Sequence, residues 1–122
     1  MTTILVVDDE VAITDLLQSL LEDVGYRVVT AVNGREALAV LGRQRPDLVL
    51  CDMMMPVLDG AGLCRAMQAD AIYRTIPLVL MSAVRQKLLI VDCMYAAVVA
   101  KPFDLEVLLA TVAYVLETKD RR

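Results

Sequence analysis

The side chains that could carry chemistry in this chain are carboxylates, a hydroxyl and an amine. Each of them follows a short apolar run of the 122-residue sequence: Asp8, Asp9, Asp52, Ser82 and Lys101. If the fold gathers the three carboxylates, they repel one another and need a cation. A divalent ion with oxygen ligands, together with the Lys101 ammonium, supplies that charge. The set therefore predicts a metal-dependent acidic site.

Magnesium suits this set better than zinc. The sequence has no histidine, and its three cysteines are scattered without a CxxC spacing. Zinc is held mainly by these two residue types, whereas magnesium takes oxygen ligands. The lack of histidine in the sequence also excludes Ser-His and Cys-His nucleophile pairs and a histidine proton shuttle.

Composition restricts the partners and the compartment. A net charge of −4 without a basic run argues against nucleic-acid binding by this chain. The longest apolar stretch, 88–100, is interrupted by Asp92 and is shorter than the ~20 residues of a membrane span. The first residues lack a signal-peptide pattern. We therefore expect a cytoplasmic protein without a membrane segment, whose reduced thiols are buried as small apolar groups: Cys51, Cys64 and Cys93.

Short apolar runs alternate with helical patterns along the chain, which is typical of βαβ units around a parallel sheet. Nearly continuous apolar runs predict strands covered on both faces at 4–7, 47–51, 77–81 and 96–100. The more polar run 26–31 predicts an edge strand. Apolar residues at helical spacing predict helices over about 13–24, 33–42, 60–69 and 103–117.

This alternation predicts one doubly wound α/β domain over residues 1–122, with 118–122 as a polar, frayed tail. In such a sheet, ligands bind outside the carboxyl ends of the strands, where all the polar residues named above are expected. Taken singly, Asp8 or Asp9 could instead cap the first helix, and Lys101 could be a surface lysine. Their joint occurrence at one edge favours a functional site.

Four stretches follow one another in a distinctive order around these strand ends. They are Val6-Val7-Asp8-Asp9-Glu10, Asp52-Met53-Met54-Met55-Pro56-Val57-Leu58-Asp59-Gly60, Met81-Ser82-Ala83 and Lys101-Pro102-Phe103. Together they resemble the receiver domain of two-component response regulators, over essentially the whole chain. The resemblance implies a flavodoxin-like, CheY-like (βα)5 fold whose five-stranded parallel sheet has the order 2-1-3-4-5.

The resemblance implies transfer of a phosphoryl group to Asp52 from the phosphohistidine of a sensor histidine kinase or a phosphotransfer protein. Asp8 and Asp9 would hold magnesium, while Ser82 and Lys101 would contact the phosphoryl group. The chain would be a phosphoacceptor and not an enzyme, limited to self-phosphorylation and self-dephosphorylation. Its phosphorylated state would switch a surface that a downstream protein reads.

Positioning and charge neutralisation, the main requirements of phosphoryl transfer, agree with these roles. The oxygen ligands of Mg²⁺, or of Mn²⁺ in its place, are expected from Asp52, Asp9, a water-linked Asp8 and the backbone carbonyl of Met54. The resemblance also implies a cis peptide bond before Pro102, which turns the preceding lysine inward.

Some positions depart from the family pattern or tune the expected reaction. Val98 stands where the family usually has an aromatic residue whose ring reports the switch, and a valine cannot do so. Met54 and Val84 lie two residues beyond Asp52 and Ser82. Apolar side chains there should hinder an attacking water, which predicts a long-lived aspartyl phosphate.

The stretch between Ser82 and Lys101 is about one helical turn shorter than the resemblance implies. We therefore expect a short helix within 84–95, which is apolar nearly all round. Such a helix favours a docking or homodimer surface that also includes the strand 96–100 and the helix 103–117. The alternative is a tightened core around a shortened helix.

A second interpretation remains open: a receiver-like interaction or dimerisation module that is not phosphorylated because Val98 and the short helix break the switch. A flavin-binding module on this fold is disfavoured, since Asp8, Asp9 and Glu10 would repel a flavin phosphate. A metal-dependent phosphatase with an aspartate nucleophile would need a second cap over the site, and the sequence predicts none.

Overall fold

The computed structural model describes residues 1–83 and 93–120. The predicted short helix within 84–95, and with it the role of Val84, therefore falls mainly outside the described residues. Within those residues, no helix combines the length and the apolar character that crossing a bilayer requires.

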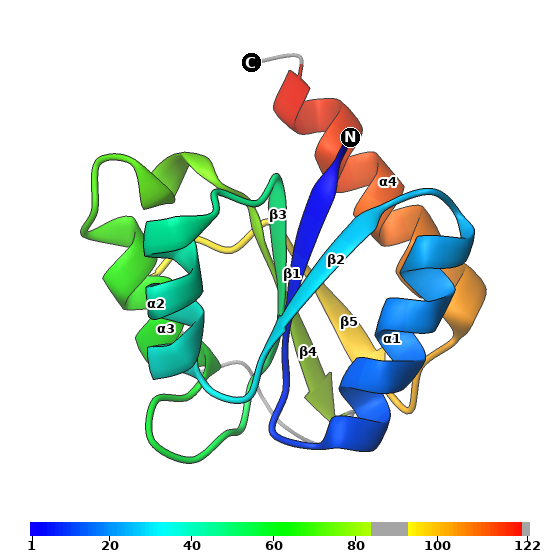
Figure 1. Ribbon diagram of the computed structural model, residues 1–122, viewed down its shortest axis with the longest axis horizontal. Helices are drawn as coiled ribbons and strands as arrows, with labels where there is room; N and C mark the ends of the chain where they lie inside the picture. The colour runs from blue at the N-terminus through cyan, green and yellow to red at the C-terminus, as the bar shows by residue number, and fades with distance from the viewer. Residues whose placement is uncertain (84–92, 121–122) are drawn as a thin grey trace.

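A parallel sheet of five strands forms the middle of the protein, in the order β2-β1-β3-β4-β5 (Figure 1). The strands are β1 Thr3–Val7, β2 Arg27–Ala31, β3 Leu48–Asp52, β4 Leu78–Ala83 and β5 Ala97–Lys101. This order confirms the predicted doubly wound, CheY-like fold. The strands begin and end within about two residues of the predicted runs, because continuous apolar segments are typical of buried parallel strands.

In the described part of the chain, four α-helices cover the two faces of this sheet, α2 and α3 on one face and α1 and α4 on the other (Figure 1). They are α1 Val11–Asp23, α2 Gly34–Arg43, α3 Gly60–Gln68 and α4 Leu105–Asp120, with a 3₁₀ turn, η1, at Tyr73–Thr75. Asn33 caps α2 and Asp59 caps α3, each by accepting a backbone N–H three residues on.

Alternation along each strand divides the core into two apolar clusters, one on each face. Leu5 of β1 belongs to the cluster with Leu41 of α2. Its neighbour Ile4 points to the other face and belongs to the cluster with Leu17 of α1 and Leu108 of α4. Strands that are apolar on both faces therefore anchor helices on both sides, which fixes the positions of their carboxyl ends.

Two details of the predicted elements are wrong. The run 96–100 predicts a strand covered on both faces, yet the burial of β5 alternates, in keeping with the edge position that the order 2-1-3-4-5 gives it. The tail predicted over 118–122 is helical as far as Asp120, the end of α4. Lys119, in the last turn of α4, donates from its ammonium to the Asp47 carbonyl oxygen at 3.1 Å.

The three cysteines are also not all reduced. Cys64 of α3 and Cys93, just before β5, form a disulfide, with Cα atoms 6.2 Å apart. Both are buried in the cluster on the α2–α3 face, where the two segments meet. The third cysteine, Cys51, is a free, fully buried thiol, as expected. Burial, followed by the nearby charges of Asp52 and Asp8, raises the pKa of Cys51, so this thiol stays neutral at pH 7.

Gly60 is where the start of α3 packs directly on the end of β3. A Cβ atom at this position would lie 2.7 Å from the carbonyl oxygen of Asp52 and 2.9 Å from the Cα atom of Met53. We expect Gly60→Ala to lower the free energy of unfolding by about 1–3 kcal/mol, because backbone must move to admit the methyl group.

Gly42, near the end of α2, provides the matched control, since its added Cβ would meet only the Tyr73 hydroxyl at 3.7 Å. Gly42→Ala should raise the free energy of unfolding by about 0.5–1 kcal/mol, because alanine favours the helix. Urea unfolding of both variants gives the comparison, and equal midpoints would contradict the close approach at Gly60.

Candidate functional site

The carboxyl ends of four strands carry the polar residues that the sequence singled out. Asp8 follows β1, Asp52 ends β3, Ser82 lies one residue before the end of β4, and Lys101 ends β5. Asp52 is paired with Met81, the residue before Ser82, in the register of β3 and β4. Parallel strands in this register bring their ends to one edge of the sheet, as predicted.

Three carboxylates meet at this edge. Asp8, Asp9 and Asp52 each offer a carboxylate oxygen, and these three oxygens lie within 4.8 Å of one another. Asp8 is fully buried and Asp52 nearly so, whereas Asp9 is exposed. Three carboxylate oxygens at this spacing are ligands for a hard divalent cation such as Mg²⁺. We name this group the acidic cluster.

Lys101 is the cation that this acidic cluster already contains. Its ammonium nitrogen lies 2.8 Å from Oδ1 of Asp52 and 3.1 Å from Oδ2 of Asp8. It also lies 5.8 Å from the centre of the Phe103 ring, a contact that the sequence analysis did not anticipate. The Lys101–Pro102 peptide bond is cis, as expected. The lysine therefore bridges two strands through their aspartates.

The acidic cluster holds more negative than positive charge, and the pKa values of Asp52 and Lys101 are both shifted. Burial, together with repulsion from Asp8 and Asp9, raises the pKa of Asp52 even though its hydrogen bond to Lys101 acts in the opposite direction. Burial alone would lower the pKa of Lys101, but the hydrogen bonds and charges of Asp52 and Asp8 outweigh it and raise that pKa. One ammonium thus compensates three carboxylates only in part.

Asp8 uses its two oxygens for different contacts. Oδ2 pairs with Lys101, while Oδ1 accepts the backbone N–H of Glu10 at 2.9 Å. The residue at the N-cap of α1 is Glu10, and its side chain makes no capping hydrogen bond. The alternative of Asp8 or Asp9 as a simple helix cap is therefore wrong, although Asp8 does order the turn that leads into α1.

The other predicted site residues lie at or just beyond the same strand ends. Ser82 is buried, and its hydroxyl donates to the carbonyl oxygen of Ala83 at 3.3 Å. Met54 lies in the loop between β3 and α3 with a side chain that is 60% exposed. The role of its backbone carbonyl as a metal ligand stays a prediction.

Val98 occupies the middle of β5, where it is paired with Leu80 of β4 and 38% exposed. Tyr95 lies before β5 and packs partly buried against the core on the α2–α3 face. It therefore does not replace the missing aromatic residue of the strand.

Comparison with known proteins agrees with this geometry. The family described as "Response regulator receiver domain" matches residues 4–113. A relative from Porphyridium aerugineum, described as "Probable transcriptional regulator ycf27", is 36% identical over 97% of this chain and 49% of its own length. The chain thus spans about half the length of the first curated relatives that it matches.

Two solved structures share the fold closely. The signal receiver domain of a signal transduction histidine kinase from Syntrophus aciditrophicus superposes with a TM-score of 0.92 at 32% identity, covering 100% of this chain and 95% of that one. The receiver domain of the sensor histidine kinase PA1611 from Pseudomonas aeruginosa PAO1, described with a magnesium ion coordinated in its active site cleft, gives 0.87 at 27% identity and covers 95% and 98%. With its predicted acidic cluster in place at the carboxyl ends of a CheY-like sheet, the chain belongs to the response regulator receiver domain family.

Proposed function

We propose that Asp52 accepts a phosphoryl group from the phosphohistidine of a sensor histidine kinase or a phosphotransfer protein, in a Mg²⁺-dependent reaction. The observation that carries this proposal is the acidic cluster with Lys101 bound to both Asp52 and Asp8 at one strand edge. The chain has no histidine, so the donor histidine belongs to the partner.

The proposed step makes one bond and breaks one bond. A carboxylate oxygen of Asp52 attacks phosphorus, and the phosphorus–nitrogen bond of the donor histidine breaks. Lys101 holds Oδ1 of Asp52 at 2.8 Å and so orients the carboxylate before the attack. Afterwards its ammonium is placed to pair with the oxygens of the phosphoryl group.

The acidic cluster fits a divalent cation by its donor chemistry, since it offers three carboxylates and neither histidine nor thiolate. We propose Asp8, Asp9, Asp52 and the Met54 carbonyl as its ligands. Bound Mg²⁺, or Mn²⁺ in its place, would neutralise charge on the transferring phosphoryl group. The magnesium described in the Pseudomonas aeruginosa receiver domain supports this assignment.

Phosphorylation is proposed to switch a surface rather than to start a catalytic cycle. The chain acts as the acceptor in the kinase's reaction and has at most self-phosphorylation and self-dephosphorylation of its own. Ser82 and Lys101 would move onto the new phosphoryl oxygens and pull the ends of β4 and β5 toward β3. A downstream protein, or a second copy of this chain, would read the changed face around β5 and α4. We also propose a cytoplasmic setting. The cysteines do not support this part of the proposal, because Cys64 and Cys93 form a disulfide.

Incubation with Mg²⁺ and a small phosphodonor such as acetyl phosphate tests this function. We expect the intact mass to rise by one phosphoryl group, and a chelator in place of Mg²⁺ to prevent the rise. A folded protein that never gains this mass would instead support the non-phosphorylated interaction module.

Met54 is proposed to lengthen the lifetime of the aspartyl phosphate, because its exposed apolar side chain follows Asp52 by two residues and can cover the phosphoryl group. Met54→Asn should speed the loss of the phosphoryl group by roughly tenfold, since a polar side chain can hold the attacking water. The decay of the phosphorylated mass after donor removal gives this rate. The exposed Met94→Asn variant, outside the site, should decay at the wild-type rate.

A further inference from the structure

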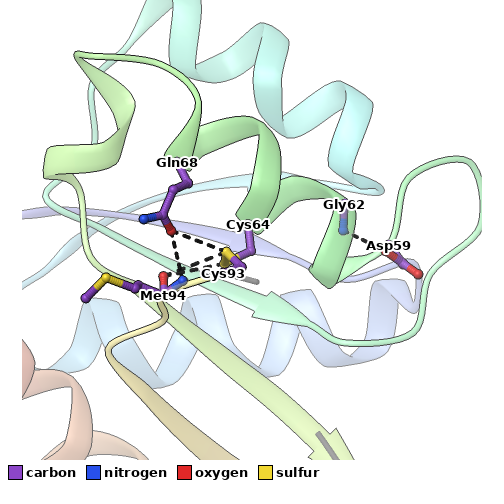
Figure 2. The surroundings of a disulfide bond; sticks show 6 residues. All are labelled: Asp59, Gly62, Cys64, Gln68, Cys93 and Met94. Atoms are coloured by element: carbon purple, nitrogen blue, oxygen red, sulfur yellow. Dashed lines mark hydrogen bonds between the residues drawn. A yellow bond between two sulfur atoms is a disulfide. The ribbon is translucent and has the colours of Figure 1, made fainter. Parts of the chain in front are cut away.

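The Cys64–Cys93 disulfide lies apart from the acidic cluster and joins α3 to the chain just before β5 (Figure 2). A second link runs beside it: the Oε1 oxygen of Gln68, one turn along α3, accepts the backbone N–H of Met94 at 2.8 Å. Two adjacent contacts therefore hold the entry to β5 against the helix.

We propose that Cys64 and Cys93 form a site of reversible oxidation, and that the disulfide state slows the phosphorylation of Asp52 by restraining the segment that leads into β5. The second half of this inference rests on the proposed function, whereas the first half does not.

The surroundings of the two sulfur atoms suit both redox states. The carbonyl oxygen of Met94 lies 3.5 Å from the Cys64 sulfur and 3.9 Å from the Cys93 sulfur. The Gln68 oxygen lies 3.6 Å from the Cys93 sulfur (Figure 2). After reduction, each thiol can donate to one of these oxygens, and its carbon atoms remain in the apolar core. Opening the disulfide therefore leaves no buried polar group without a partner at this site.

Small redox partners have a route to the disulfide. A cleft of about 880 Å³ is lined by Cys64, Gln68 and Met94, with Tyr95 and Arg74 further along its wall. The two cysteines are nearly buried, so a protein surface cannot reach them directly, but a small peroxide or dithiol in the cleft can meet Cys64, the one of the two that lines it.

A peroxide oxidises the two thiols to the disulfide in two steps. One thiolate attacks the peroxide, its sulfur–oxygen bond forms, the oxygen–oxygen bond breaks, and one water leaves after protonation. The second thiol then attacks the sulfenic sulfur and releases a second water as the disulfide forms. In the reverse direction, a dithiol reductant exchanges with the disulfide through a mixed disulfide and is itself oxidised, so that both thiols are restored.

The disulfide is connected to the acidic cluster through the sheet. The 29-residue span that it closes contains all of β4, including Ser82. Beyond Cys93 the chain continues into β5, which ends at Lys101 and its contacts with Asp52 and Asp8. A rearrangement that moves Ser82 and Lys101 toward β3 must therefore move chain on both sides of the cross-link. A state that tethers this chain to α3 favours the unswitched conformation.

The test compares the oxidised and the reduced protein with acetyl phosphate and Mg²⁺. Thiol alkylation under denaturing conditions should modify one cysteine, Cys51, after peroxide treatment and three after reduction. The reduced form should be phosphorylated at least about fivefold faster, the low end of coupling between two sites. The Cys64→Ser/Cys93→Ser variant should be fast in both conditions, and Cys51→Ala should respond to oxidation like the wild type.

Hydrogen exchange of the backbone amides of 94–101 separates this inference from the proposed function. These amides should exchange more slowly in the oxidised form. If neither form gains a phosphoryl group, the proposed function is overturned and the exchange still decides whether the redox site exists. The inference would be overturned by three alkylated cysteines after oxidation, or by equal amide exchange in the two forms. It would also be overturned if both forms were phosphorylated at equal rates.

Discussion

Replacing Asp52 with asparagine should abolish phosphoryl acceptance completely. The amide keeps the shape of the carboxylate but lacks the anionic oxygen that attacks phosphorus. Asp8 also contacts Lys101, at 3.1 Å, but it is fully buried and its other oxygen already accepts the Glu10 N–H, so Asp52 is the carboxylate placed to react. Intact mass after incubation with acetyl phosphate and Mg²⁺ should therefore show no gain for Asp52→Asn.

Asp23→Asn serves as the matched control. Asp23 is an exposed residue at the end of α1. This end of the helix lies away from the carboxyl ends of the strands (Figure 1). The substitution removes the same charge from the chain, so the variant should gain the phosphoryl mass at the wild-type rate. A mass gain in Asp52→Asn would show that another residue is the acceptor.

Asp52→Asn should also raise the free energy of unfolding when no divalent cation is present. Because the pKa of Asp52 is higher in the folded than in the unfolded protein, ionisation of this group costs stability as the pH rises through the folded pKa. Asparagine cannot ionise and therefore removes this cost. Urea unfolding should give Asp52→Asn the higher midpoint without Mg²⁺, and added Mg²⁺ should narrow the difference.

The sequence predicts the acidic cluster well because strand ends can be read from local pattern. Each apolar run fixes a strand, and a parallel sheet aligns the carboxyl ends of its strands. The positions of Asp8, Asp52 and Lys101 at one edge follow from these two facts. The distances between the Lys101 ammonium and the two aspartates cannot be predicted in this way, because they depend on the direction in which the chain leaves β5.

The disulfide and the partial exposure of β5 could not be predicted from local pattern, although the order 2-1-3-4-5 that the resemblance implies does place β5 at an edge. Cys64 and Cys93 are 29 residues apart with no spacing signal, and only the packing of α3 against the entry to β5 brings them together. The single hint is that Cys64 lies on the buried face of α3 with Leu63 and Met67. A continuous apolar run likewise does not distinguish a central strand from an edge strand such as β5, because its length and composition are the same.

Replacing Lys101 with methionine should lower the free energy of unfolding by about 2–3 kcal/mol in the absence of divalent cation. Methionine keeps much of the apolar stem but removes the ammonium that pairs with Asp8, which is fully buried, and with Asp52. Breaking a buried ion pair from one side is costly because the remaining charge loses its partner. Here two carboxylates lose their partner at once, although the 20% exposure of Lys101 lets water offset part of the cost.

Lys119→Met is the matched control, because Lys119 also pairs with an aspartate but at the surface. Its ammonium lies 3.8 Å from Asp47, and the two side chains are 30% and 45% exposed. Exposed pairs of this kind contribute little, so this variant should lose less than about 1 kcal/mol. Urea unfolding with and without Mg²⁺ measures the free energy of unfolding of Lys101→Met and of Lys119→Met.

The effect of Mg²⁺ on the free energy of unfolding should also differ between Lys101→Met and Lys119→Met. A cation held by the acidic cluster replaces part of the charge that Lys101 supplied, so Mg²⁺ should stabilise Lys101→Met more than the wild type and should affect Lys119→Met no more than the wild type. This follows from the composition of the site, in which one ammonium faces three carboxylates. If Mg²⁺ stabilised Lys101→Met and the wild type equally, the lysine and the metal would not share the same carboxylates, and the proposed ligand set would be wrong.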